Sequence, residues 1–169
     1  MAKASSRKSV PKGYGTVTPW IISEDSAKLI VFLKEAFGAK EKAGSRVVNE
    51  HGGIDHVEIQ IGDSTVMLFD SHESWPVTPA FIRLYLADAD EAYQQALRAG
   101  ATPVTEVTEL FWGDRVGRVR DPLGNIWWLQ THVKDIPAEE MQKRMQDPEQ
   151  IGAMHYVQQS LTDELDSRK

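Results

Sequence analysis

The sequence predicts an α+β fold in which two paired β-α-β-β-β modules form a cupped sheet, here called the cup. Residues 18–39 have the pattern of a strand, an acidic turn and an amphipathic helix closed by Phe37-Gly38-Ala39. Residues 81–101 repeat this order and end in Ala99-Gly100-Ala101. Further short strand-like runs follow each Gly-Ala pair, so the chain carries one unit twice. Because two small half-sheets that face each other enclose a hollow, the repeat also predicts where a ligand would bind.

The length of 169 residues suits a single domain, because two half-size modules can share one core of that size. We expect a flexible N-terminal tail over residues 1–13, a domain over residues 14–133 and a helical C-terminal extension over residues 134–169. Within the domain, the two modules span residues 14–72 and 78–133.

Composition excludes several classes of partner and site. The 19 basic and 25 acidic side chains give a net charge of -6, the wrong sign for holding a nucleic acid. With no cysteine, the chain has neither a disulfide framework nor a thiolate metal site, and redox chemistry leaves the compartment open. The longest aliphatic and aromatic run, Leu29 to Leu33, is far shorter than the roughly 20 residues of a membrane span. Residues 1–13 lack the apolar stretch of a secretory signal, so we expect a cytoplasmic protein with no membrane partner.

Both expected helices have clear start and stop signals. The first begins after Ser23-Glu24-Asp25 and ends at Gly38, a residue suited to a left-handed C-terminal position. The second begins at Asp88, with Glu91 three residues later as an acidic variant of the capping box, and ends at Gly100. Apolar residues recur at spacings of three and four in both helices, which predicts one buried stripe on each.

The strands of the first module form a predicted hairpin. In residues 56–61 one face is polar and the other aliphatic, which is typical of a half-buried strand. The segment Gly62-Asp63-Ser64 then predicts a tight turn into a strand over residues 65–70.

The second module opens with a strand over residues 81–86, whose aliphatic face is expected to lie under the second helix. Its last two strands, residues 115–120 and 126–131, flank Asp121-Pro122-Leu123-Gly124-Asn125, in which proline and glycine suit a turn. The charged segment beyond them, broken at Pro148, predicts one or two helices that pack on the outside or on a partner subunit.

Three motifs together resemble the vicinal oxygen chelate superfamily, which includes glyoxalase I, bleomycin-resistance proteins and extradiol dioxygenases. The motifs are the Gly-Ala helix ends, Phe111-Trp112-Gly113-Asp114-Arg115, and the segment from Asp121 to Trp127. The PhnB-like branch is most similar, and the resemblance covers about residues 15–132. It implies the glyoxalase/bleomycin-resistance fold. It also implies that metal-dependent members hold a divalent ion with His, Glu or Gln from the first and last strands of each module. Relatives with this fold commonly pair two chains, so we expect a homodimer.

The four positions that correspond to those metal ligands carry no usual ligand. Counting from the helix ends and hairpin turns places them at Thr18, Leu68, Phe81 and Trp128. A divalent ion needs carboxylate or imidazole donors at about 2.0–2.2 Å, which these side chains do not offer. We therefore expect no metal. We expect no nucleotide cofactor either, since no Gly-rich loop opens a helix. A register slip of one residue would bring Pro19, Met67, Ile82 and Trp127 to these positions, and none of them is a good ligand.

Strand alternation also predicts which side chains line the cup. Those expected to face it are Thr18, Trp20, Ile22, His56, Glu58, Gln60, Val66, Leu68, Asp70, Phe81, Arg83, Tyr85, Trp128 and Gln130. Met67 and Phe69 are expected on the helix-covered face. An aromatic-walled pocket with a few polar groups suits a flat, partly apolar small molecule held by stacking and hydrogen bonds. The candidate ligand-binding residues are Trp20, His56, Glu58, Leu68, Phe81, Arg83, Trp112, Arg115 and Trp128, of which Trp20, Phe81 and Trp128 could equally fill the core.

Two pairs of polar residues have alternative roles. His56 and Glu58 project from the same face of a strand and are the candidate catalytic pair, because a carboxylate can orient an imidazole for acid-base work. They could equally be solvated or hydrogen-bonded residues at the edge of the cup. Arg83 and Arg115 could bind a ligand carboxylate or phosphate, or could pair with an acidic side chain of the protein.

The favoured function is therefore metal-independent binding of a small, partly aromatic or apolar molecule, either for sequestration as in the bleomycin-resistance proteins or for an activity that the sequence does not assign. The first alternative is a metal-dependent lyase, isomerase or dioxygenase of the same superfamily that uses unconventional ligands such as His56, Glu58 and Asp70. The second alternative is an interaction protein without a ligand, whose cup is plugged by Trp20 and Phe81 together with Trp128.

Overall fold

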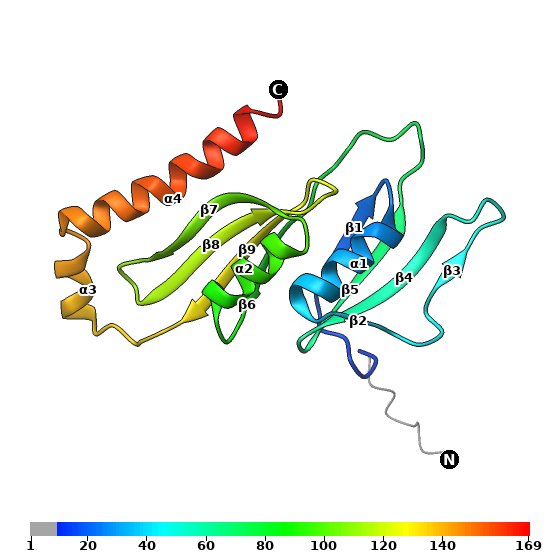
Figure 1. The fold of residues 1–169 in the computed structure, drawn as a ribbon. Helices are drawn as coiled ribbons and strands as arrows, with labels where there is room; N and C mark the ends of the chain where they lie inside the picture. Colours follow the sequence, from blue (N-terminus) through cyan, green and yellow to red (C-terminus); the bar gives the residue numbers. More distant parts are fainter. Residues whose placement is uncertain (1–9) are drawn as a thin grey trace, which may run out of the picture.

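Two mixed β-sheets, one from each predicted module, lie side by side in the computed structural model, which describes residues 10–169 (Figure 1). In chain order the elements are β1 (Trp20–Ser23), α1 (Ser26–Phe37), β2 (Lys40–Glu41), β3 (Val47–Val48), β4 (Ile54–Ile61), β5 (Ser64–Asp70), β6 (Phe81–Tyr85), α2 (Ala89–Arg98), β7 (Thr102–Glu109), β8 (Asp114–Arg120), β9 (Ile126–His132), α3 (Ala138–Arg144) and α4 (Pro148–Asp166). The first sheet has the order β1-β5-β4-β2, with β3 paired to β4, and the second has the order β6-β9-β8-β7. In each sheet the opening strand lies parallel to the last one, and the other pairs are antiparallel. The predicted α+β fold of two such modules followed by a C-terminal helix is confirmed.

The two helices begin and end where the sequence predicts. The Asp25 side chain accepts a hydrogen bond from the Lys28 backbone N–H (2.8 Å), and Asp88 does the same for Glu91 (2.9 Å). Gly38 ends α1 with a φ of 63°, a conformation that costs glycine little and other residues much more.

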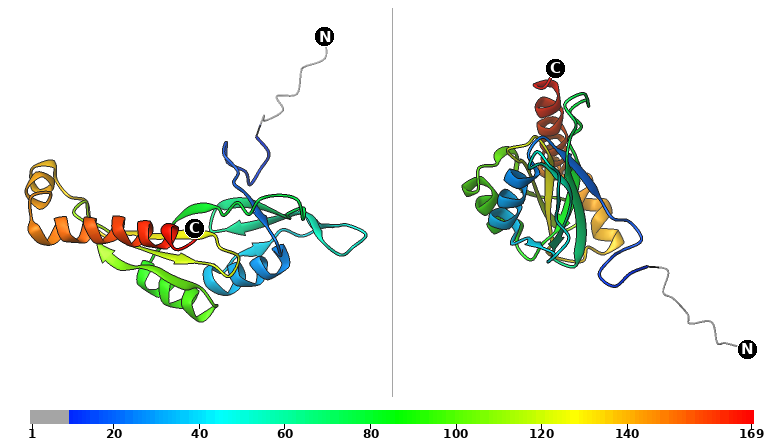
Figure 2. Two further views of the ribbon diagram at one scale, coloured as in Figure 1. Left: turned by 90° about the horizontal axis from the view of Figure 1, so that it is seen from above. Right: turned by 90° about the vertical axis from the view of Figure 1, so that its right-hand side faces the viewer.

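The modules share one hydrophobic core on the side of the sheets that α1 and α2 cover (Figure 1; Figure 2, right). The Phe37 ring of α1 packs against Trp127 of β9, with ring centroids 5.2 Å apart. Between the helices, Gln95 Nε2 donates to the Glu35 carbonyl (2.7 Å). The two modules therefore pack against each other through a shared core.

The register of β5 differs from the prediction by one residue. The β4–β5 turn contains two residues, Gly62 and Asp63, so Ile61 pairs with Ser64. The sequence pattern predicts a turn of three residues, Gly62-Asp63-Ser64. In an antiparallel hairpin this difference moves every side chain of the second strand to the opposite face.

Leu68 therefore lies in the core and not on the face predicted for it. It is 0% exposed and is paired with Ile21 of β1 and Val57 of β4. The predicted positions of Val66 and Asp70 are wrong for the same reason. Val66 is buried in the core, and the Asp70 carboxylate accepts backbone hydrogen bonds at the start of α1 and β4.

We call the sheet faces turned away from α1 and α2 the open faces. The open face of the first sheet carries Trp20, His56, Glu58, Gln60, Met67 and Phe69, and that of the second carries Phe81, Arg83, Tyr85, Arg118, Trp128 and Gln130. The sheets lie side by side in both figures, so the open faces do not face each other within one chain. Within one chain both faces are left open, and Trp20 and Phe81 are 63% and 58% exposed.

The C-terminal helix α4 lies along β7 and shields part of the second open face (Figure 1). Its Tyr156 hydroxyl accepts a hydrogen bond from the Glu106 N–H (2.9 Å), and Val157 packs against Leu110 and Val116. At the other end of the chain, Gly13 accepts a hydrogen bond from the Thr65 hydroxyl (2.7 Å). Most of the predicted tail, residues 1–9, lies outside the described residues. Among the helices of the described part of the chain, none combines the length and apolarity needed to cross a bilayer.

Candidate functional site

Aromatic side chains cluster on the open face of the first sheet. Trp20 packs edge-on against Phe69, with ring centroids 5.4 Å apart. Trp75, in the segment after β5, approaches both Phe69 (6.2 Å) and His72 (4.5 Å) in the same edge-on manner. The exposed Trp20 ring thus stands on a fixed aromatic support, which is suited to stacking against a flat molecule.

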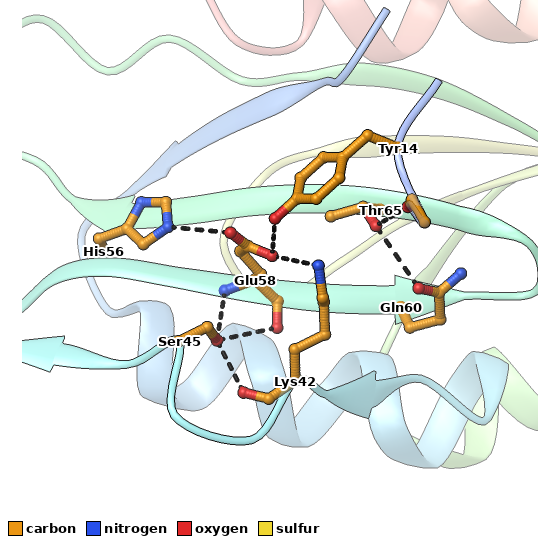
Figure 3. Close-up of polar contacts among 8 residues, drawn as sticks. Tyr14, Lys42, Ser45, His56, Glu58, Gln60 and Thr65 are labelled. Carbon is orange, nitrogen blue, oxygen red and sulfur yellow. Dashed lines mark hydrogen bonds and ion pairs between the residues drawn. The ribbon is translucent and has the colours of Figure 1, made fainter. Parts of the chain in front are cut away.

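A polar cluster centred on Glu58 lies on the same face (Figure 3). The Tyr14 hydroxyl donates to Glu58 Oε2 (2.5 Å), and Lys42 Nζ lies 2.5 Å from the same oxygen. The Lys42 ammonium also stands over the Tyr14 ring, 4.0 Å from its centroid. The Ser45 hydroxyl fixes the strand beneath by accepting from the Glu58 N–H (3.1 Å). The segment before β1 and the β2–β3 connection are thereby tied to β4.

These contacts determine the charge of the cluster. The hydrogen bonds from Lys42 and then Tyr14 hold the pKa of Glu58 below its usual range, and Glu58 in turn raises the pKa of Lys42. His56 Nε2 lies 3.6 Å from Glu58 Oε1, which is longer than a hydrogen bond. Glu58 is thus an ionised carboxylate occupied mainly by Tyr14 and Lys42. It is in contact with His56 but does not orient the imidazole by a hydrogen bond.

Arginines and Trp128 dominate the open face of the second sheet. Arg83 of β6 and Arg118 of β8 flank Trp128 of β9, with guanidinium carbons 4.7 and 4.0 Å from the indole centroid. They border a cavity of about 210 Å³ that is also lined by Phe81, Ile82, Ile126 and Leu161 of α4.

Arg118 is unusual because it is only 6% exposed. Its Nη1 donates to the Val157 carbonyl (2.6 Å) and to the Thr105 hydroxyl (3.0 Å), both uncharged acceptors. Burial, and then the charge of Arg83, lowers the pKa of Arg118 to about 10. The group therefore still carries its charge near neutral pH.

A chain of hydrogen bonds leads from Trp128 to the end of β9. The indole Nε1 donates to Gln130 (2.9 Å), whose amide donates to Asp114, and the other Asp114 oxygen contacts His132 Nδ1 (2.7 Å). Burial works to raise the pKa of Asp114, but the hydrogen bonds from His132 and Gln130 outweigh it, and the pKa is lowered. These contacts fix the orientation of the indole ring.

Two other predicted residues lie outside this face. Arg115 points to the helix side, where its Nε and Nη2 each donate to the Asp90 carboxylate at 2.7 Å. Trp112 packs at the edge of the small cluster formed by Leu110, Val116 and Val157. The structure therefore brings together Phe81, Arg83 and Trp128 on one open face, and Trp20, His56 and Glu58 on the other.

The sequence patterns do not identify Arg118, Tyr14 and Lys42 as residues of the site. The alternation of β8, counted back from the turn at Asp121, could have placed Arg118 opposite Trp128. Tyr14 and Lys42 lie outside the long strands, and no local pattern connects them to Glu58.

The residues at the four expected metal positions do not fit a divalent ion. Thr18, Phe81 and Trp128 offer no carboxylate or imidazole, and the corrected register replaces Leu68 with Met67 or Phe69. Within residues 10–169, no group of three or more His, Cys, Asp or Glu side chains is arranged to hold a metal ion. Asp70 in particular faces the core side and does not join His56 and Glu58.

Comparison with known proteins agrees with this architecture. Residues 15–129 match the model of the Glyoxalase/Bleomycin resistance protein/Dioxygenase superfamily. The uncharacterized protein Rv0887c of Mycobacterium tuberculosis (strain ATCC 25618 / H37Rv) is 36% identical over 140 residues, covering 76% of this chain and 81% of that protein. Among solved structures, TioX from Micromonospora sp. ML1 is similar with a TM-score of 0.57 and 24% identity, over 69% of this chain and 99% of that one. A gene product from Arabidopsis thaliana is similar with a TM-score of 0.54 and 27% identity, over 68% of this chain and 97% of that one. With its family model matched over most of its length, the chain belongs to the glyoxalase/bleomycin resistance protein/dioxygenase superfamily.

Proposed function

We propose that this protein binds a small, partly aromatic molecule on its open faces without using a divalent metal. The observation that carries the proposal is the exposure of large aromatic rings on both faces. Trp20 is 63% exposed, and Phe81 and Tyr85 are 58% and 66% exposed. Exposed aromatic surface of this kind marks a place where a ligand or a partner binds.

Metal independence is supported by the side chains at the expected ligand positions. A thioether, a hydroxyl and aromatic rings do not replace the carboxylates and imidazoles that such ions prefer. The metal-dependent alternative required His56, Glu58 and Asp70 to converge, and Asp70 instead holds backbone N–H groups at the start of α1 and β4.

We further propose that a second copy of the chain closes the cup. One chain leaves both open faces uncovered over much of their area, and a homodimer could bring the first face of one copy onto the second face of the other. Light scattering should then give about twice the chain mass of 19.0 kDa, and a mass near the single value would contradict the dimer.

Particular residues also bear on the branch of the superfamily and on the alternative of a protein without a ligand. The loop from Phe111 to Arg115 and the turn at Asp121 support membership of the PhnB-like branch. The ligand-free alternative required Trp20 and Phe81 to plug a closed cup, and in the single chain both rings are accessible.

The binding proposal is tested by titrating flat aromatic compounds and following tryptophan emission. We expect several compounds to quench the emission, and Trp20→Ala to weaken their binding roughly tenfold or more, because an anchoring ring is lost. Val31→Ala is the matched control, since Val31 is 54% exposed on α1, away from the open faces.

Two results would overturn the proposal. One is a broad panel of flat compounds that leaves the emission unchanged. The other is stoichiometric nickel, zinc, manganese, cobalt or iron in protein purified without chelator, detected by elemental analysis.

A further inference from the structure

Two cations meet at the cavity of the second open face, and neither has an anionic partner within the part of the chain that the structure describes. Among residues 10–169, no carboxylate oxygen lies within 4.0 Å of Arg83 or Arg118. The two other arginines of β8 each have an acidic partner. Arg115 is paired with Asp90 at 2.7 Å, and Arg120 with Glu164 at 3.2 Å.

The lack of a partner matters most for Arg118, because its side chain is buried. A charged group removed from water is costly unless an opposite charge or sufficient hydrogen bonds compensate it. Arg118 has a carbonyl, a hydroxyl and the face of Trp128, each of which supplies only partial negative charge. Arg83 adds like-charge repulsion from the other side of the same indole.

From this geometry we propose that the cavity between Arg83, Arg118 and Trp128 binds the oxyanion group of a small organic acid. The two guanidinium groups would donate to a carboxylate or a phosphonate, whose negative charge supplies the missing partner. This inference rests on the proposed function, because the cavity belongs to one of the two open faces, and it names the chemical class of the ligand.

The walls of the cavity define the remainder of that ligand. Phe81, Ile82, Ile126 and Leu161 are apolar, so the body attached to the oxyanion should be flat and apolar. The volume of about 210 Å³ is below the roughly 300–1,000 Å³ of sites for drug-sized molecules, which favours a single ring or a short chain.

The test compares benzoate with benzamide, its uncharged counterpart of the same shape, by isothermal titration calorimetry on the full chain. We expect benzoate to bind roughly tenfold or more tightly than benzamide, because only the anion engages the guanidinium groups. Phenylphosphonate is titrated in parallel, and the tighter of the two anions identifies the oxyanion that the site prefers.

Arg83→Gln is the decisive variant, because Arg83 is exposed and its replacement should leave folding intact. It should weaken benzoate binding roughly tenfold and leave benzamide binding unchanged. Arg98→Gln is the matched control, since it removes the same charge from an exposed position on α2. Arg118→Lys keeps the buried charge but removes the planar donor pair, and should weaken benzoate binding in protein whose melting curve shows that it is folded.

Benzoate that binds no more tightly than benzamide, or an Arg83→Gln variant that binds benzoate like the parent, overturns the inference. If benzamide and other neutral rings bind in that case, the proposed function survives and only the anion assignment fails. If no flat compound binds, charged or neutral, both fail.

Discussion

Replacing Leu68 with alanine should destabilise the protein by about 3 kcal/mol, within the roughly 2–5 kcal/mol range for a buried leucine. Leu68 is 0% exposed and lies between Ile21 of β1 and Val57 of β4, so the strands on both sides limit any collapse into the cavity. At about 1.4 kcal/mol for each factor of ten, the unfolding equilibrium constant should rise roughly a hundredfold. In a chain of this size the melting temperature should fall by roughly 6–12 °C.

Met67→Ala is the matched comparison, because Met67 is the neighbouring residue on the open face and is only half-buried. It should cost about 1 kcal/mol or less. Chemical and thermal denaturation of the two variants, followed by circular dichroism, measure the difference. If Met67→Ala costs as much as Leu68→Ala or more, the β5 register that pairs Ile61 with Ser64 is wrong, and Leu68 returns to the ligand face.

Two further predictions concern polar contacts. Asp121→Ala should lower the free energy of unfolding, measured by denaturant titration, by about 3 kcal/mol or more. The Asp121 carboxylate accepts a hydrogen bond from the buried Trp127 Nε1 (2.8 Å) and from several donors of the turn, and alanine leaves these donors without an acceptor. A cost below about 1 kcal/mol would contradict this role. The hydrogen bonds that the His132 ring donates to Asp114 and then to Asp135 raise the pKa of His132 above its ordinary 6.5, so this contact stabilises the fold below about pH 6.5 and is lost as pH rises through the raised value. It is also lost in acid, as pH falls through the lowered pKa of Asp114. The stability difference between the parent and His132→Gln should therefore be largest in the mildly acidic range, and a difference that grows toward alkaline pH would refute the assignment.

The features that the sequence could predict are those carried by local signals. Asp25, Asp88 and Gly38 mark helix ends through short-range hydrogen bonds and backbone preferences, and the structure has them at those ends. In the second module the pattern predicts the observed register, because the closing turn is long and well marked and because Trp127 and Leu129 alternate with Gln130.

In the first module, neither the turn nor the alternation of apolar and polar residues indicates the register of β5. Val66, Met67, Leu68 and Phe69 are all apolar, so β5 has no polar face to reveal its orientation, and only the turn length decides it. Ser64 is equally compatible with a turn or a strand. The sequence therefore left the register to one ambiguous residue.

Contacts between segments far apart in the sequence also could not be predicted. Tyr14 and Glu58 are 44 residues apart in sequence, and Arg118 meets the α4 backbone at Val157, 39 residues away. No periodicity within a strand encodes such pairs. Arg118 is a partial exception. The alternation of side chains along β8 places it on the open face, but nothing in that pattern predicts that α4 buries it.

The two open faces differ in charge in a way that bears on how a ligand would lie between them. On the first face the Glu58 carboxylate is neutralised by Lys42 at 2.5 Å, so the face offers Trp20 and its aromatic support without an unpaired charge in that cluster. On the second face, Arg83 and Arg118 leave positive charge uncompensated within the described residues. If a second copy closes the cup as proposed, an acid with a flat body should bind with its oxyanion at the arginines and its far end against Trp20 of the other copy. Arg83→Gln would then reduce the preference for anions over neutral rings, whereas Trp20→Ala would weaken both alike. The opposite pattern would show that the two faces do not act on one ligand.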